Sequence, residues 1–332
     1  MVLSFGELLL RLSRDTTGRW LDKSLVNIYM GGSEINIISA LAQWRMPVCF
    51  CTVLPDNFIA REIVKQIAEQ NIDTSAIIYY GDKIGLYYLE HENLLTGESI
   101  IYDRLHSSFY DLQPGVINWD NVFNGVRWFH FSSLSAGLHE NVAAVCKEAL
   151  AVCARKNITV SAYMHHQPQI WLNKNKPAEV MPELLQYCDV LISDVQSINA
   201  MLEMQYPAAL NMRREDTMQL AKKISEEFIK QFQKCKIVAN NFCSYDSAIE
   251  MYGTAFTNNN LYISASYKSN NIVDKAGSGD CFVAGLIYGV YNHLPFQQVI
   301  NFAAAAGFQK LFVKGDRINK TAEEIKSFIL HY

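Results

Sequence analysis

The chain carries the stretch IVDKAGSGDCFVAGL at residues 272–286. A strand-like approach leads into Gly277, Ser278 and Gly279, and Asp280 follows at the start of an apolar segment with helical spacing. Amides of such a turn can converge on an anion, because no side chain blocks the approach and the helix N-terminus adds positive potential. A carboxylate beside that anion can take a proton from an attacking hydroxyl. The stretch therefore predicts phosphoryl transfer to an alcohol; the alternative is a glycine turn in which Asp280 only caps the helix.

Composition and charge exclude several classes of protein. The chain has 332 residues, 50% of them hydrophobic, which is enough for a full core. Its net charge of -4 comes without any basic run, so nucleic acid is not an expected partner. We find neither a basic leader nor an apolar run long enough to span a bilayer, and expect a cytoplasmic protein that does not bind membranes. The 8 cysteines are scattered, and only Cys49 and Cys51 lie close together, which favours buried free thiols over a zinc site.

Strand-like apolar runs alternate with segments of helical period along most of the chain. This alternation predicts an α/β fold with a parallel sheet wound by helices. The expected strands are 48–53, 75–79, 126–131, 158–163, 190–192 and 235–239. The expected helices are 33–45, 59–69, 141–155, 217–233, 280–292, 295–312 and 321–330.

Two neighbouring segments interrupt this alternation. Residues 85–90 and 99–104 have the pattern of a hairpin, with Thr96-Gly97-Glu98 in the turn. With strand-like residues near 8–12 and 25–29, they predict a discontinuous β-lid of about 8–30 and 85–105. Such a lid is expected to fold over the carboxyl edge of the main sheet, where α/β sites form. We expect a single domain over residues 1–332.

Two motifs resemble those of a known family. Residues 30–37, MGGSEINI, lead into a helix ending near Trp44, and 274–285 contain the glycine turn. Together they resemble the signatures of the phosphofructokinase-B, or ribokinase-like, sugar kinases. Further landmarks, most similar to those of the 2-keto-3-deoxygluconate kinases, follow in order at 5–13, 54–57, 81–88, 101–104 and 128–132. The resemblance covers nearly the whole chain and implies a ribokinase-like, doubly wound, mostly parallel sheet with helices on both faces and a small β-lid.

The resemblance also implies roles for individual residues. It makes Asp280 the base for a sugar hydroxyl and sets the phosphates of ATP, with Mg²⁺, against the turn amides. The implied phosphate-binding residues are Ala276, Gly277, Ser278 and Gly279. The implied sugar-binding residues are Gly31, Gly32, Asn36, Tyr87, Tyr102, Arg104 and Asp280. Of these, Arg104 can pair with the carboxylate of an acid sugar; the alternatives are a solvated edge charge for Arg104 and an exposed helix-start residue for Asn36.

One departure from the family's motifs falls on the sugar side. Where the 2-keto-3-deoxygluconate kinases carry Asp-x-Asn-x-Arg, this chain has Tyr163, His165 and Gln167. The lost Arg contacts the acid sugar in that family, so either the substrate differs or its carboxylate relies on Arg104. We keep Gln167 as a candidate sugar ligand. Adjacent His165 and His166 point to opposite faces of an extended segment, which argues against a shared metal ion.

Two further departures fall on the nucleotide side. The family's Asn-x-x-Glu is replaced by Asp194 and Ser197, from which Asp194 can still reach Mg²⁺ through water. The strand that ends in Thr-Leu-Arg in the family carries Ala239 and Asn241, so a hydroxyl and a cation near the nucleotide are absent.

The residues support two main hypotheses. The first is an ATP-dependent kinase acting on 2-keto-3-deoxygluconate or a related sugar acid. The second, motivated by the departures, is a catalytically weakened member that binds sugar or nucleotide as a sensor or partner. A nucleotide-binding oxidoreductase is disfavoured because Gly-x-Gly-x-x-Gly is absent from the N-terminal region. The lid hairpin presents strand edges that members of the resembled family often bury by pairing lids in a dimer, so we expect a homodimer.

Overall fold

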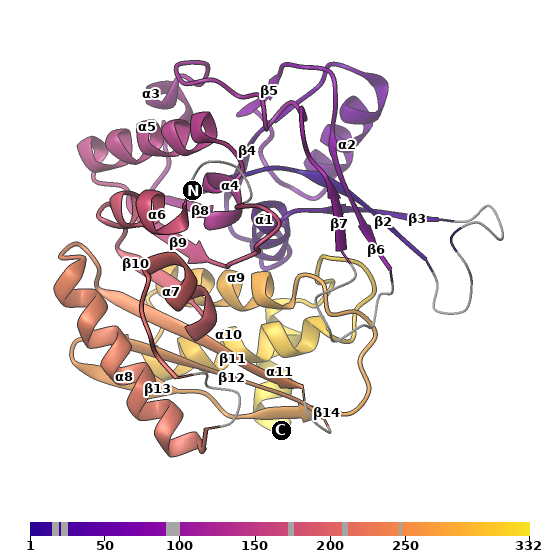
Figure 1. The fold of residues 1–332 in the computed structure, drawn as a ribbon. Coiled ribbons are helices and arrows are strands. Elements are labelled where there is room, and N and C mark those ends of the chain that lie inside the picture. The colour runs from indigo at the N-terminus through magenta and orange to yellow at the C-terminus, as the bar shows by residue number, and fades with distance from the viewer. Residues whose placement is uncertain (15–19, 21–25, 91–99, 172–175, 208–211, 246–247) are drawn as a thin grey trace.

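The computed structural model describes residues 1–332 except 15–19, 21–25, 91–99, 172–175, 208–211 and 246–247. These described residues form one large and one small sheet (Figure 1). The large sheet has the order β13-β12-β11-β10-β9-β8-β1-β4-β5, with β14 beside β12. Its strands are β1 Val2–Phe5, β4 Val48–Leu54, β5 Ile77–Tyr79, β8 Trp128–Ser132, β9 Thr159–Met164, β10 Val190–Ser193, β11 Ile237–Tyr245, β12 Ile249–Thr257, β13 Asn260–Ile263 and β14 Tyr267–Ser269.

Neighbouring strands from β11 to β5 run parallel, which confirms the predicted α/β class. Alternate residues of these strands face two separate cores: Val48 and Phe50 enter one, Cys49 and Cys51 the other. The helices are α1 Ser33–Gln43, α2 Phe58–Glu69, α3 Trp119–Val122, α4 Ser133–Ala136, α5 Glu140–Lys156, α6 Pro177–Leu185, α7 Val195–Leu202, α8 Arg214–Gln231, α9 Ser278–Tyr291, α10 Phe296–Lys310 and α11 Ala322–His331.

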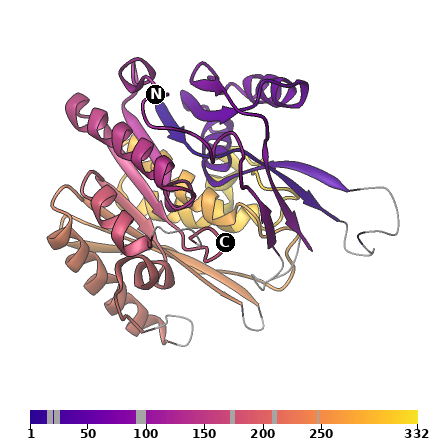
Figure 2. The ribbon, with the colours of Figure 1, turned by 45° about the horizontal axis from the view of Figure 1, so that its top comes forward.

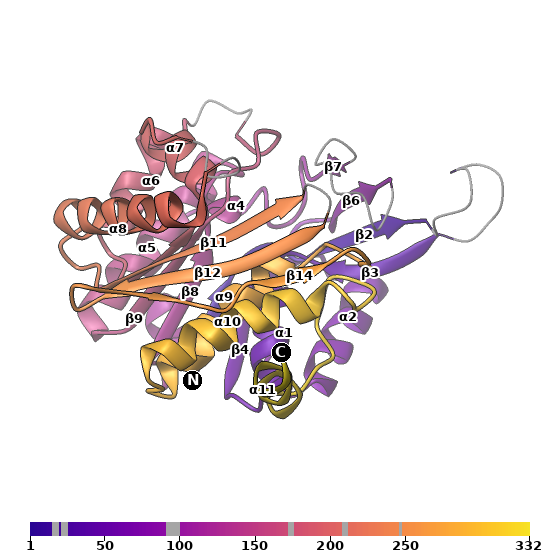
Figure 3. The same cartoon turned by 90° about the horizontal axis from the view of Figure 1, so that it is seen from below.

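Helices cover both faces of the large sheet, as predicted. Buried side chains of α1, α2, α9, α10 and α11 belong to one core, and those of α3, α5, α6, α7 and α8 to the other. Figure 3 shows the two helical layers on opposite sides of the strands. Every predicted helix is present, with its ends moved by a few residues.

The small sheet has the order β3-β2-β6-β7 and projects beyond the large one (Figure 2). It contains β2 Leu9–Ser13, β3 Asn27–Gly31, β6 Gly85–Leu89 and β7 Ile100–Asp103. The expected antiparallel pairing of β6 with β7 is present, with Tyr87 opposite Tyr102. The expected turn at Thr96-Gly97-Glu98 lies outside the described residues.

Sequence reasoning missed the antiparallel edge of the large sheet. The strand expected to end near Ala239 continues as β11 to Tyr245, and β12, β13 and β14 follow. Asn258 and Asn259 have φ values of 48° and 62° and join β12 to β13. Two Asn residues between β-branched and aromatic runs are a hairpin signal, so this pair was readable from the sequence.

The structure confirms the expectation of buried free thiols for most of the cysteines. All the cysteines are free; seven are buried and Cys243 is half-buried. Among the described residues, no helix combines the length and apolar character that crossing a membrane requires.

Candidate active site

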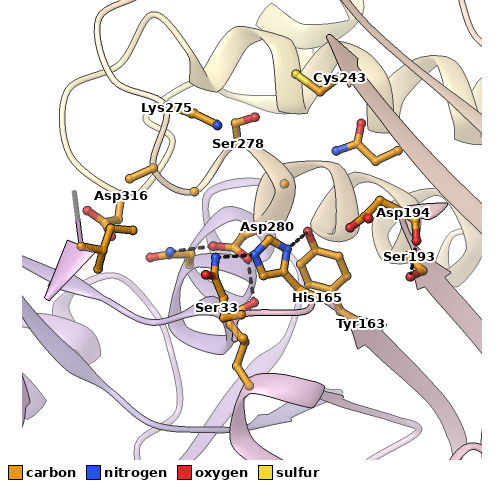
Figure 4. A pocket seen from close by; sticks show the side chains of 18 of the residues that line it. Ser33, Tyr163, His165, Ser193, Asp194, Cys243, Lys275, Ser278, Asp280 and Asp316 are labelled. Atoms are coloured by element: carbon orange, nitrogen blue, oxygen red, sulfur yellow. Dashed lines mark hydrogen bonds between the residues drawn. The ribbon is translucent and has the colours of Figure 1, made fainter. Parts of the chain in front are cut away.

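A cavity of about 790 Å³ lies where β9 and β10 end and α9 begins, and it reaches the small sheet. Figure 4 shows its lining, with Asp280 near the centre. The carboxyl end of parallel strands is where open α/β sheets place their ligands. Residues far apart in the sequence therefore meet at one site, among them Asn36, Tyr102, Asp194 and Asp280.

Asp280 lies in the first turn of α9 and faces this cavity (Figure 4). Its Oδ1 accepts a hydrogen bond of 2.6 Å from Ser33 Oγ, and its Oδ2 one of 2.8 Å from Asn36 Nδ2. Burial raises the pKa of Asp280 to about 6, although the bonds from Asn36 and Ser33 oppose the shift. The alternative that Asp280 merely caps α9 fails, since its carboxylate bonds to side chains of α1.

The turn before α9 presents fewer free amides than the sequence suggested. The amide of Ala276 already donates to Asp274 Oδ1 at 3.0 Å, and that of Ser278 donates to the Lys275 carbonyl at 3.3 Å. Within the described part of the chain, the amides of Gly277, Gly279 and Asp280 make no hydrogen bond. The amides of Gly277, Gly279 and Asp280 can therefore donate to an anion directly, whereas those of Ala276 and Ser278 already hold the turn in shape; phosphate binding by residues 276–279 stays a prediction.

Gly277 is required by the geometry of this turn. Its φ is +77°, and a Cβ there would lie 1.8 Å from the Asp316 carbonyl oxygen. No other residue type fits both constraints. At Gly279 a Cβ would lie 2.7 Å from the Tyr163 hydroxyl, so the turn and β9 are in close contact.

The two N-terminal glycines have different roles. Gly32 lines the cavity at φ +123°, and a Cβ there would meet the Glu7 carbonyl at 2.4 Å. Gly31 is not among the lining residues; a Cβ there would crowd Asp316 and Tyr87. The lack of a side chain at Gly31 leaves room for Tyr87, and the implied sugar contact of Gly31 stays a prediction.

The small sheet contributes Tyr87, Tyr102 and Arg104 to the lining. The Tyr87 hydroxyl donates to Asp316, so that group is already engaged. Arg104 is only 7% exposed, and its Nε donates to Glu7 Oε2 at 2.5 Å. Within the described residues its terminal nitrogens make no hydrogen bond, which leaves them free for a ligand. Arg104 is thus not a solvated edge charge.

Glu7 and Glu34 were not predicted as site residues, yet both line the cavity. Glu34 is buried and accepts from the amide and hydroxyl of Ser132 and from the hydroxyl of Ser135. Burial raises the pKa of Glu34, and these bonds oppose the rise. The sequence signal for each was its place in a motif shared with the family: Glu7 lies in 5–13 and Glu34 in 30–37.

These elements match a known family in fold and sequence. A sequence model of the pfkB family carbohydrate kinases covers residues 1–322. The chain belongs to this family. It is therefore a carbohydrate kinase with the ribokinase-like fold, as its motifs predicted.

Named pfkB relatives span nearly the whole chain. A 5-dehydro-2-deoxygluconokinase of Geobacillus kaustophilus is 25% identical over 307 residues, which is 92% of this chain and 85% of that protein. The crystal structure of a 2-dehydro-3-deoxygluconokinase from Thermotoga maritima is 28% identical, with a TM-score of 0.90 and 99% of each chain covered. A putative ribokinase II from E. coli, solved with ATP and Mg²⁺, has the same fold at 15% identity and a TM-score of 0.78, with 100% of this chain and 99% of that chain covered.

At the first departure from the pfkB motifs, Tyr163, His165 and Gln167 contact one another beside Asp280. The Tyr163 hydroxyl lies 3.2 Å from His165 Nδ1 (Figure 4). His165 Nε2 lies 2.9 Å from Gln167 Nε2. All three line the cavity, whereas His166 does not. The two histidines therefore diverge as expected, and the described residues hold no cluster of three or more His, Cys, Asp or Glu side chains suited to a metal.

At the second departure from the pfkB motifs, the carboxylate of Asp194 is bonded to Ser197 of the same segment. Its carboxylate accepts from the Ser197 amide at 2.8 Å and from the Ser197 hydroxyl at 2.6 Å, and so caps α7. Asp194 nevertheless lines the cavity. In the third departure, Asn241 lines the cavity, whereas Ala239 is fully buried in the core.

Proposed function

We propose that this pfkB kinase transfers the terminal phosphoryl group of ATP to a hydroxyl of 2-keto-3-deoxygluconate or a related keto-deoxy sugar acid. The observation that carries the proposal is the Asp280 carboxylate, held by Ser33 and Asn36 beside three free amides. The two named relatives described above, each a kinase of a dehydro-deoxygluconate, support this class of substrate.

In the proposed reaction Asp280 acts as the general base. The sugar hydroxyl gives its proton to Asp280 as its oxygen bonds to phosphorus, and the bond from that phosphorus to the leaving diphosphate breaks. The amides of Gly277, Gly279 and Asp280 stabilise the charge on the transferring group. Asn36 and Ser33 hold the carboxylate still, which keeps it aligned with the hydroxyl.

The lining fits a nucleotide that brings its own magnesium. Asp194 is the predicted metal residue, but both of its oxygens bond to Ser197, so it suits a water-mediated contact better than direct coordination. When bound, Mg²⁺ with ATP supplies positive charge along the phosphates. The chain's own part is to orient those phosphates with the free amides of the turn.

Arg104 is the proposed carboxylate ligand. Replacing it with glutamine is expected to raise KM for the sugar acid about ten- to a hundredfold, since a hydrogen bond to a charged group contributes about 1.5–3 kcal/mol. Turnover of a neutral keto sugar should fall far less, and the acid-to-neutral ratio of kcat/KM measures the difference. Equal losses for both substrates would reject the assignment.

Lys83→Gln is the matched control for that variant. Lys83 lies at the base of the small sheet, where its ammonium donates to Asp103 Oδ1 at 2.7 Å, and it does not line the cavity. Loss of its charge should leave the acid-to-neutral ratio unchanged.

The binding-only alternative rests on the altered segments at Tyr163, Asp194 and Asn241. ATP turnover with keto-deoxy acids, aldonic acids, neutral hexoses and nucleosides separates the two functions. Turnover of an acid supports the proposal. Thermal stabilisation by these ligands without any turnover would support the alternative.

A homodimer and a cytoplasmic location also stay predictions. Ile28 on β3 and Ile101 on β7 are 65% and 68% exposed at the outer strands of the small sheet, which suits pairing of two such sheets. Light scattering should give twice the chain mass, and a monomer at micromolar concentration would contradict this.

A further inference from the structure

Arg11 is a fully buried cation that lies outside the proposed chemistry. It lies on β2, opposite Tyr29 and Tyr87 in the small sheet, and its side chain is 0% exposed. Its Nη1 donates to Asp316 Oδ1 at 2.7 Å and its Nη2 to Asp274 Oδ2 at 2.8 Å. Arg11 does not line the cavity, so it is not placed to touch substrate.

The carboxylate of Asp274 holds the phosphate-binding turn in shape. Its Oδ1 accepts from the Ala276 amide at 3.0 Å, and its Oδ2 accepts from the Gly315 amide at 2.9 Å. Asp274 thereby joins the turn before α9 to the loop after α10. The guanidinium of Arg11 holds this junction from the small sheet.

Asp316, in the loop after α10, contacts the same turn. Its carbonyl oxygen lies directly against Gly277, and its side chain accepts from the Tyr87 hydroxyl. Tyr87 and Asp316 line the cavity, while Arg11 lies behind them. The small sheet is thus tied to the turn through both Arg11 and Tyr87.

A second buried basic side chain lies close to Arg11 and its two carboxylates. Lys310 is 0% exposed, and its ammonium donates to the carbonyls of Asp274 at 3.3 Å and Val313 at 2.9 Å. Arg11 pairs directly with the carboxylates of Asp274 and Asp316, whereas the Lys310 ammonium is bonded to backbone carbonyls and adds positive charge near Asp274. Burial raises the pKa of Asp274, and the charge of Arg11 opposes the rise. Loss of Arg11 would remove the ion-pair partner of both buried carboxylates.

We propose that Arg11 is a positioning residue that locks the sugar-binding sheet to the phosphate-binding turn. Arg11 bonds to Asp274, which lies before α9, and to Asp316, which lies in the loop after α10. These two bonds set the distance between the sugar hydroxyl and the phosphate. The inference rests on the proposed function, because a fixed distance matters only if both ligands bind at this site. A displacement of about 1 Å can cost about a hundredfold in rate.

The test is Arg11→Lys, which keeps the charge but cannot bond to both carboxylates in the same fork geometry. We expect kcat to fall about a hundredfold, while the Kd of ATP changes little. Within 274–280, hydrogen exchange of the bonded amides of Asp274, Ala276 and Ser278 should accelerate in the unliganded variant, and that of β8, β9 and β10 should not. Wild-type kcat with wild-type exchange would overturn the proposal, and so would faster exchange across the whole chain, which indicates only a structural role.

Two further variants keep the test decisive. Arg11→Ala should regain part of its kcat when millimolar guanidinium is added, and absence of rescue in a folded variant would overturn the proposal. Arg61→Lys is the control, since Arg61 pairs with Asp56 at the surface and should tolerate the change. If the wild type phosphorylates no sugar acid, the proposed function fails, while exchange in 274–280 still decides the role of Arg11.

Discussion

Replacing Asp280 with asparagine is expected to lower kcat by about two to four powers of ten, the usual contribution of a positioned base. The amide has nearly the same shape and can still bond to Ser33 and Asn36, so the turn should remain intact. Binding of ATP and sugar should therefore change little, as calorimetry on the variant can show. Near-normal kcat in Asp280→Asn would remove the base from the mechanism and favour a different role for the cavity.

The same variant should change the pH profile. Because Asp280 must be deprotonated to accept a proton, and its pKa is raised to about 6, wild-type kcat/KM should fall as the pH drops through that value. The residual activity of Asp280→Asn should lack this acidic limb. Asn36→Ala removes a hydrogen bond that favours the ionised carboxylate and should therefore raise the pKa of Asp280. The fall of kcat/KM at acidic pH should then begin at a higher pH. Asp120→Asn, a change at an exposed ion pair, should leave the limb in place.

Replacing Gly277 with alanine should have the second large effect. An added Cβ would lie 1.8 Å from the Asp316 carbonyl oxygen, so the turn or its neighbouring loop must move. Two of the three free amides belong to Gly277 and Gly279, and a shift of about 1 Å in them should cost about a hundredfold in kcat. Steady-state kinetics, with circular dichroism to confirm folding, measures this loss.

Gly115→Ala is the matched control for Gly277→Ala. Gly115 has a φ of +82°, similar to the +77° of Gly277, but nothing lies within 4 Å of its would-be Cβ. Both variants share the backbone strain of a left-handed alanine, about 1–2 kcal/mol, and only Gly277→Ala adds the clash at the site. Equal kinetics in the two variants would show that strain, and not the turn's geometry, decides activity.

Local sequence patterns predicted a helix or strand well where its type follows from the pattern of its own residues. The apolar run after Asp280 is helical in the structure, and the runs 48–53 and 158–163 match the parallel strands β4 and β9 to within one residue at each end. The antiparallel edge from 249 to 269 was missed, although the Asn258-Asn259 turn indicated a hairpin. Overlooked turn chemistry accounts for that error.

The candidate site was predicted less completely than the fold. Asp280, Asn36, Gly32, Arg104 and Gln167 meet at one cavity; family motifs implied the first four, and Gln167 lies where the chain departs from a motif. The amides of Ala276 and Ser278 are already bonded, and Glu7 pairs with Arg104. A motif indicates which groups a segment carries but does not show which partners have already engaged them.

The sequence by itself determined the alternation of strands and helices, the glycine turn and the carboxylate at its end. These follow from side-chain periodicity and backbone freedom, which are properties of neighbouring residues. Only the tertiary structure decided which amides stay free, which acid pairs with Arg104, and how Arg11 meets Asp316 across 305 residues of chain. Such pairings depend on where the sheets place distant segments, because a buried charge requires a partner within a few ångströms wherever that partner lies in the sequence.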